Sequence, residues 1–133
     1  QRENRRRAEA RARGQRVLDL FCYQGEWALH AARGGAAEVL AVDSSAPALE
    51  AARRNAERNG LAERITFRQG DCFDIVRELE RKGERFGMII LDPPALIKSR
   101  SHLAGGARAY REINRAAMGL LAEGGTLGTW RSR

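Results

Sequence analysis

Four aspartates follow four successive apolar runs of the sequence, and their spacing is the first sign of chemistry. Asp19, Asp43, Asp71 and Asp92 each lie near or just past the end of such a run. One aspartate in this position commonly caps the next helix. Four of them would place carboxylates along one rim of a parallel sheet, where open α/β folds bind their ligands. We therefore predict a ligand site built on carboxylates.

Asp43 has the position of a ribose-binding acid, because it lies 18 residues beyond Gly25. A carboxylate there accepts hydrogen bonds from both hydroxyls of a ribose diol. The neighbouring Ser44 and Ser45 either assist it or cap the helix that follows.

The stretch QGDCFD supplies a second set of candidates. Asp71 can accept a hydrogen bond from the exocyclic amine of adenine, Cys72 can donate its backbone N–H, and Phe73 can place an apolar ring beside the purine. The alternative is structural, with Asp71 as the cap of a helix.

The loop FCYQG narrows the choice of ligand. A dinucleotide site needs G-x-G-x-x-G after the first strand, but Phe21 and Tyr23 are bulky and only Gly25 remains. A phosphate-binding P-loop lysine is also absent. These features disfavour a dehydrogenase. They favour an adenosine ligand without phosphates whose other end is cationic, since Asp19 would attract it. We predict S-adenosylmethionine.

The segment LDPPALIKS is the candidate substrate side of the site. Pro93 and Pro94 make a stiff, extended turn that presents Asp92 to a flat, amine-bearing base. Lys98 and Arg100 could contact backbone phosphates at its lip. The alternatives are that the prolines only stop a helix and that the two cations are ordinary solvated charges.

Apolar runs alternate with helical periodicity along the chain, which predicts an α/β fold: a Rossmann-like, doubly wound and mostly parallel sheet. Strands that are apolar throughout, such as VLDLF and MIILD, are typical of parallel strands buried on both faces. We expect helices over 3–13, 25–34, 45–59, 72–82 and 107–122, and strands over 16–21, 38–42, 64–68, 86–91 and 125–130.

Composition sets the broad class. The 133 residues are 43% hydrophobic and 31% charged, as in globular chains. No apolar run is long enough to span a membrane, so we expect no membrane partner. Two cysteines make no disulfide framework, and we expect a cytoplasmic protein without a metal site.

The positive charge is concentrated at the start. Residues 1–16 hold seven arginines and two glutamates, whereas 17–130 hold 15 basic and 15 acidic side chains. We expect one cofactor-binding domain over 1–133, with a basic helix over 1–15 and a core over 16–133. The local excess favours RNA as a partner; a helix that is basic only for solubility is the alternative.

Several motifs together resemble the class I methyltransferase domain of the large-subunit ribosomal RNA cytosine-5 methyltransferases. The resemblance implies a Rossmann-like sheet, S-adenosylmethionine as methyl donor and ribosomal RNA as substrate. It also makes Gln1 and Arg2 candidates for cofactor contact, weaker than the residues named above. In this family a small RNA-binding domain normally precedes the methyltransferase domain. The segments that carry the resemblance are QREN (1–4), VLDLFCYQGEWALHAA (17–32), VLAVDSSAPALEAARRNAERNG (39–60), FRQGDCFDIV (67–76), ILDPPALIKS (90–99) and AYREINRAAMGLLAEGGTL (109–127).

One departure from that family concerns the nucleophile. Methylation of cytosine C5 needs a cysteine thiolate that adds to C6, and the family carries it just after the fifth strand. Here the stretch reads GTWRSR, in which Thr129 matches and Trp130, Arg131 and Ser132 replace the cysteines. Transfer to an exocyclic nitrogen, which needs no thiol, and a non-catalytic cofactor- or RNA-binding module therefore remain open. We also expect a sheet truncated after its fifth strand and a homodimer through its exposed edge.

Overall fold

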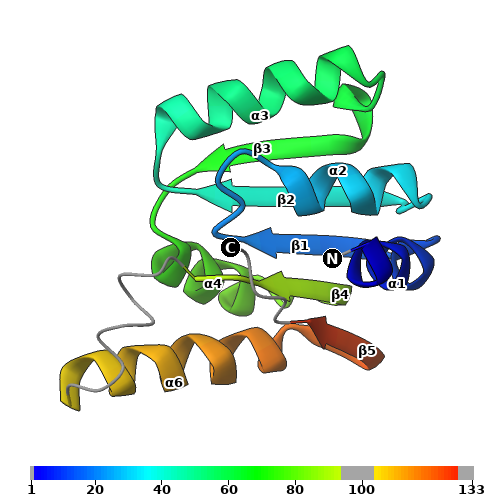
Figure 1. Ribbon diagram of the computed structural model, residues 1–133. Helices are drawn as coiled ribbons and strands as arrows, with labels where there is room; N and C mark the ends of the chain where they lie inside the picture. The colour runs from blue at the N-terminus through cyan, green and yellow to red at the C-terminus, as the bar shows by residue number, and fades with distance from the viewer. Residues whose placement is uncertain (1, 94–103, 129–133) are drawn as a thin grey trace.

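The computed structural model describes residues 2–93 and 104–128 of the chain, and it confirms a five-stranded parallel sheet with helices on both faces (Figure 1). The strand order is β3-β2-β1-β4-β5, so the order reverses between β1 and β4. In order along the chain, the elements are α1 (Arg2–Ala12), β1 (Arg16–Leu20), α2 (Glu26–Arg33), β2 (Glu38–Asp43), α3 (Ala46–Arg58), η1 (Ala62–Arg64), β3 (Ile65–Gln69), α4 (Cys72–Arg81), β4 (Phe86–Leu91), α6 (Ala104–Gly119) and β5 (Leu121–Gly128).

Helix boundaries follow local signals in the first four-fifths of the chain. Ser45 caps α3 by accepting a hydrogen bond from the backbone N–H of Ala48 at 3.1 Å, with Pro47 in the first turn. Gly35, at φ +96°, follows the end of α2 and donates its N–H to the Ala32 carbonyl. The cap at Ser45 is one of the two roles that the sequence predicted for it.

The last helix and strand correct the sequence-based boundaries. We expected a helix to residue 122 and a strand from 125, but α6 ends at Gly119 and β5 begins at Leu121. The Phe86 N–H donates to the carbonyl of Leu120 at 2.8 Å, so pairing with β4 begins directly after the end of α6. The ladder then shifts register between Phe86 and Met88. This long-range pairing is invisible to helical periodicity.

Successive side chains of the strands pack alternately into two separate hydrophobic cores, one on each face of the sheet. Val17, Ala41 and Ile90 face the core covered by α1, α2 and α3, whereas Leu18, Val42 and Ile89 face the core covered by α4 and α6. Among the described helices, none is both long enough and apolar enough to cross a bilayer.

The basic helix α1 is part of the fold. Ala8 and Ala12 are fully buried in the first core, so the helix contributes one small-residue face to the packing. A Cβ placed on Gly34, at the end of α2, would collide with the backbone of Glu9. The two helices therefore pack in close backbone contact, and Arg5, Arg6, Arg7 and Arg11 of α1 are exposed.

Candidate functional site

Strand register brings three of the four predicted acids to one face at the reversal of strand order. Leu20 of β1 lies level with Val42 of β2 and with Leu91 of β4. Asp43 and Asp92 each come one residue after that level, and Asp19 one residue before it. Since side chains alternate along a strand, all three belong to the face covered by α2.

The loop between β1 and α2 is built from backbone conformations that side chains rarely adopt. Phe21 and Tyr23 have φ values of +62° and +50°, and Gly25 has +80°. The Cys22 N–H donates to the Val42 carbonyl at 2.9 Å, and the Gly25 N–H donates to the Cys22 carbonyl at 2.7 Å. These bonds hold two non-glycine residues in the left-handed region, strain of the kind that collects at functional sites.

Asp43 is held by this loop and by its own helix. Its Oδ2 accepts the backbone N–H of Tyr23 at 2.8 Å, and its Oδ1 accepts the N–H of Ser45 at 2.9 Å. Each oxygen keeps a second lone pair. The carboxylate is thus fixed in orientation and half-buried, with acceptor capacity for two more hydrogen bonds.

Asp19 has the most costly environment among the described side chains. It is 1% exposed, and neither of its oxygens has a hydrogen-bond partner in the described residues. Burial raises its pKa well above the ordinary value, and the charges of Asp92 and Asp43 raise it further. The nearby backbone N–H of Ala28 opposes this shift in part, although its geometry does not make a hydrogen bond. A buried polar group without a partner is a strong sign of a ligand site.

Gly25 is required by space as well as by conformation. A Cβ at this position would lie 2.9 Å from the Cβ of Ala52 in α3. The absence of a side chain lets the start of α2 approach α3. The region beyond the carboxyl ends of β1 and β2, where open α/β folds bind their ligands, is called the crevice below.

The third candidate group lies at the start of α4. Asp71 caps this helix through Oδ1, which accepts the N–H of Asp74 at 3.1 Å. Phe73 meets Phe21 edge to face, with ring centroids 6.3 Å apart. The Phe21 N–H donates to the Cys72 Sγ at 3.3 Å. The alternative structural role of Asp71 is therefore present; the adenine contact stays a prediction.

Both cysteines are buried thiols rather than thiolates. Burial is the main reason that the pKa of Cys72 rises to about 12. Burial also raises the pKa of Cys22, and by more. The nearby carboxylates of Asp19 and Asp43 add to both shifts. Neither sulfur is activated as a nucleophile.

Other predicted residues are placed only in part. The side chain of Tyr23 is 62% exposed, so its contribution inside the site is its backbone N–H. Ser44 is exposed, and its carbonyl accepts the side-chain amide of Gln69 at 3.4 Å. Pro93 is buried directly after Asp92. The candidates that lie outside the described residues are Gln1, Pro94, Lys98, Arg100 and the stretch 129–133.

Sequence reasoning missed the backbone donors that organise the site. The N–H groups of Tyr23, Ser45 and Ala28 act on Asp43 and Asp19. No residue type marks a backbone donor, because every residue except proline carries one. The available sequence signal was the pair Phe21 and Tyr23 before Gly25. We interpreted these residues as bulky side chains and not as a turn with left-handed backbone conformations.

Comparison with known proteins agrees with this geometry. Residues 1–130 match the family model described as S-adenosylmethionine-dependent methyltransferase. The chain is 47% identical over 131 residues to ribosomal RNA large subunit methyltransferase I of Aeromonas hydrophila and 45% identical to that of Photobacterium profundum. Each alignment covers 98% of this chain and 33% of the relative.

Solved structures show the same fold. A methyltransferase crystallised in complex with SAH superposes with a TM-score of 0.80 at 25% identity, covering 96% of this chain and 34% of that one. TrmN from Thermus thermophilus superposes with a TM-score of 0.72 at 32% identity, covering 94% and 36%. The chain spans about a third of the length of the relatives that it matches. By its family model and its fold, the chain belongs to the S-adenosylmethionine-dependent methyltransferases.

Proposed function

We propose that the crevice above β1 and β2 binds S-adenosylmethionine and that the chain serves the methylation of ribosomal RNA. The observation that carries the proposal is the pair of carboxylates at the ends of these strands. Asp43 is fixed by two backbone N–H groups, while Asp19 is buried without a hydrogen-bond partner among the residues that the structure describes. One suits a ribose diol and the other suits a positive charge.

The acidic crevice fits this cofactor better than it fits a dinucleotide. The charges of Asp92 and Asp43 act on Asp19, and a site with several carboxyl groups disfavours a pyrophosphate and favours the sulfonium and the ammonium group of the methionine end. The resident cofactor would supply an electrophilic methyl group. Among the chain's own residues, Phe21 and Gly25 would shape the methionine end.

The adenine would lie at the start of α4. Phe73 is half-buried beside Phe21, and Cys72 begins the helix with its backbone N–H directed as a helix N-terminal donor. Asp71 uses one lone pair of Oδ1 for its cap and retains acceptor capacity for an exocyclic amine. Adenine recognition would thus share a residue with helix capping.

The substrate proposal rests on the relatives and on charge. Relatives that match 98% of this chain are named ribosomal RNA large subunit methyltransferase I. The arginine-rich start of the chain supports a polyanionic substrate. In the parent protein we place the methyl group on cytosine C5, with Asp92 orienting the base by a hydrogen bond.

Transfer to an exocyclic nitrogen of a base is the second candidate, and the state of the thiols favours it. Cys22 and Cys72 are the two cysteines of the sequence, and both are buried with a raised pKa. Neither can supply the thiolate that C5 chemistry needs. Nitrogen transfer needs no thiolate; the amine must be held in line with the methyl group, and Asp92 would accept a hydrogen bond from it. A third possibility is that the chain binds cofactor or RNA without catalysis.

Calorimetry with S-adenosylmethionine tests the cofactor site. Asp43→Ala should weaken binding by about 1.5–3 kcal/mol, the loss of hydrogen bonds to a charged acceptor. Asp74→Ala is the matched control, because that carboxylate lies on the exposed face of α4 and pairs with Arg77. Heat from NAD instead of S-adenosylmethionine, or equal binding by both variants, would contradict the proposal.

Labelled methyl transfer tests the reaction. Ribosomal RNA is incubated with the chain and methyl-labelled cofactor, and the nucleosides are then separated. Label in 5-methylcytosine supports the first candidate, and label on an exocyclic nitrogen supports the second. Cofactor binding without any transfer is the result expected of a non-catalytic module.

Three broader expectations remain proposals. We propose one cofactor-binding unit over 1–133, a cytoplasmic location and a homodimer through the edge of β5. In the described residues, β5 pairs with β4 alone, which leaves the other side of that strand unpaired. Light scattering over a concentration series tests the dimer, and a constant monomer mass would contradict it.

A further inference from the structure

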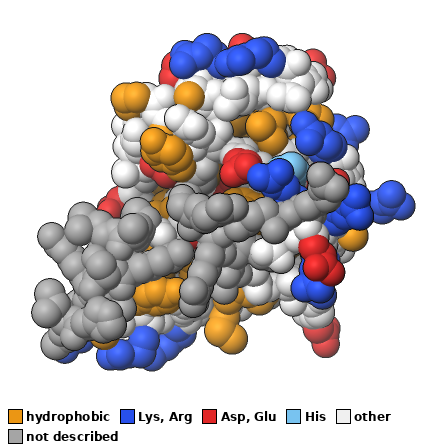
Figure 2. Space-filling model, in the orientation of Figure 1, with side chains coloured by type: hydrophobic (Ala, Val, Ile, Leu, Met, Phe, Trp, Pro, Cys, Tyr) orange, Lys and Arg blue, Asp and Glu red, His pale blue; other side chains and the backbone are white. Residues whose placement is uncertain are grey.

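A second charged region lies on the same face of the molecule, between α1 and α2. It is an open hollow of about 560 Å³, and Figure 2 shows Lys and Arg side chains gathered over this side of the molecule. The residues that line the hollow are Arg6, Glu9, Ala10, Arg13, Arg33 and Gly34.

The arginines on and beside α1 and α2 differ in their partners. Arg5 pairs with Glu26 at 3.3 Å and Arg7 with Glu3 at 3.2 Å, so these charges are balanced on the surface. By contrast, Arg6, Arg13 and Arg33 have no carboxylate partner among the described residues. Arg33 donates to the neutral side-chain oxygen of Asn59 at 3.2 Å. These three guanidinium groups line the hollow, whereas Arg11, which donates to the neutral hydroxyl of Thr126 at 3.5 Å, does not.

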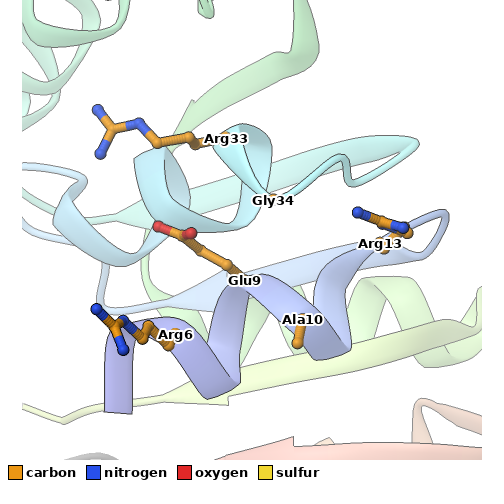
Figure 3. Close-up of a pocket in the computed structure, with 6 residues that line it drawn as sticks. All are labelled: Arg6, Glu9, Ala10, Arg13, Arg33 and Gly34. Carbon is orange, nitrogen blue, oxygen red and sulfur yellow. The ribbon is translucent and has the colours of Figure 1, made fainter. Parts of the chain in front are cut away.

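The single acid of the hollow does not cancel this charge. Glu9 lies between Arg6 and Arg13, and Figure 3 shows its side chain rising from α1 toward α2. There its Oε2 lies 2.9 Å from Nδ1 of His30, a half-buried contact that keeps the carboxylate away from the arginines. One carboxyl group against three guanidinium groups leaves a net positive surface.

The hollow also has a direction and a rigid frame. The Arg5–Glu26 pair places the start of α1 beside the start of α2, next to the carboxyl ends of the strands. The far ends of the two helices meet where the Gly14 N–H donates to the Gly35 carbonyl at 2.8 Å. From Arg6 to its end at Ala12, α1 rises about 9 Å, and Arg13 follows directly. A nucleic-acid strand carries about two or three phosphates over such a length.

We propose that this hollow binds the phosphodiester backbone of RNA through Arg6, Arg13 and Arg33, and leads the strand away from the methyl-transfer crevice. The inference rests on the proposed function, because it gives an RNA substrate a second point of attachment. Arginine suits the task since its planar fork matches two phosphate oxygens at once. Contacts of this kind position a strand without reading its sequence.

The test is the binding of a fluorescently labelled RNA oligonucleotide of mixed sequence, followed by anisotropy at several salt concentrations. Replacing all three arginines by alanine should weaken binding about tenfold and reduce the slope of log affinity against log salt by about 2, or about 0.7 for each lost phosphate contact. The control variant replaces Arg81, Arg111 and Arg115, which are exposed on α4 and α6 over the opposite face. It should keep the affinity and the slope.

The outcomes separate this inference from the proposed function. No RNA binding by the unaltered chain, or an equal loss in both triple variants, would overturn the hollow as an RNA site. Displacement of the RNA by inorganic phosphate at equal phosphate concentration would also overturn it, since the site would then serve a free anion. Calorimetry with S-adenosylmethionine on the same variants should be unchanged, which also shows that they fold. Arginine-dependent RNA binding without any cofactor binding would support the hollow and overturn the proposed function.

Discussion

The strand-end crevice and the hollow between α1 and α2 are both regions of like charge, yet they hold that charge in opposite ways. In the crevice, Asp19 is 1% exposed and lies within the influence of Asp43 and Asp92. In the hollow, Arg6, Arg13 and Arg33 are exposed at the surface. Water can solvate the arginines but cannot reach the buried aspartate.

The difference indicates what each region requires. A buried carboxyl group without a partner carries a desolvation penalty that only a bound donor or cation relieves. Exposed guanidinium groups carry little penalty, so they gain from a polyanion mainly by releasing counterions. The crevice should therefore select a ligand by shape and hydrogen bonding, and the hollow should select by charge density alone.

The largest expected effect comes from closing the crevice at Gly25. Gly25→Ala forces a side chain into the left-handed region and against Ala52, at a cost of about 2–4 kcal/mol in unfolding free energy. Cofactor affinity should fall with it, while RNA binding at the hollow should persist. Gly60→Ala is the control, because Gly60 also has a positive φ but has open space around it, so it should lose only about 1–2 kcal/mol. Thermal unfolding and calorimetry measure both quantities, and equal losses would show that packing at Ala52 is unimportant.

Salt should divide the two regions next. Raising the salt concentration fourfold should weaken RNA binding about 20-fold if three phosphates are held, and should leave cofactor affinity within about twofold, because buried charges are screened little. Anisotropy and calorimetry in the same buffers provide the comparison. A cofactor affinity as salt-sensitive as the RNA affinity would mean that the crevice is open to solvent.

Asp19→Asn should improve the fold while harming the site. Burial raises the pKa of Asp19, so the folded chain keeps a proton on this carboxyl group at pH values where the unfolded chain releases it. Asp19 therefore lowers the free energy of unfolding as pH rises above 3.8, the ordinary pKa of an aspartate. The variant should gain about 1–2 kcal/mol at neutral pH, with a shallower decline of stability between acid and neutral pH. Its affinity for S-adenosylmethionine should fall. A variant that is less stable at neutral pH would contradict the assigned penalty.

The smallest effect concerns charges that are already paired. Arg68 donates to Glu78 at 2.7 Å, and this bond, with a second from Lys82, lowers the pKa of Glu78 from 4.5 to about 2. Its stabilising contribution is complete above pH 4.5 and is lost as pH falls toward 2. The unfolding curves of Glu78→Gln and the unaltered chain should therefore differ slightly at neutral pH and converge in acid. Neither ligand should bind differently, since the pair lies outside both regions.

Much of the fold follows from local patterns. The alternation of apolar runs with helical periodicity predicted every strand and α-helix that the structure describes, although not the short 3-10 helix η1, and Ser45 with Pro47 marked the start of α3. These signals are local, because a cap or an amphipathic face depends on residues within a few positions. The boundary between α6 and β5 was wrong for the opposite reason: pairing with β4 decides it, and β4 is more than 25 residues away in the chain.

The sequence by itself determined which carboxylates could form a site, because a residue at the end of a parallel strand must lie at the shared edge of the sheet. Only the tertiary structure decided what each one does. The strand register buried Asp19 in the sheet and placed Asp43 beside the loop between β1 and α2. The left-handed conformations of Phe21 and Tyr23 then brought the backbone N–H of Tyr23 to Asp43. It also decided which arginines lie unpaired in one hollow, since packing α1 onto α2 joins residues from two separate segments. Burial and ion pairing depend on which residues are close in space, and residues that are close in space can be far apart in the sequence.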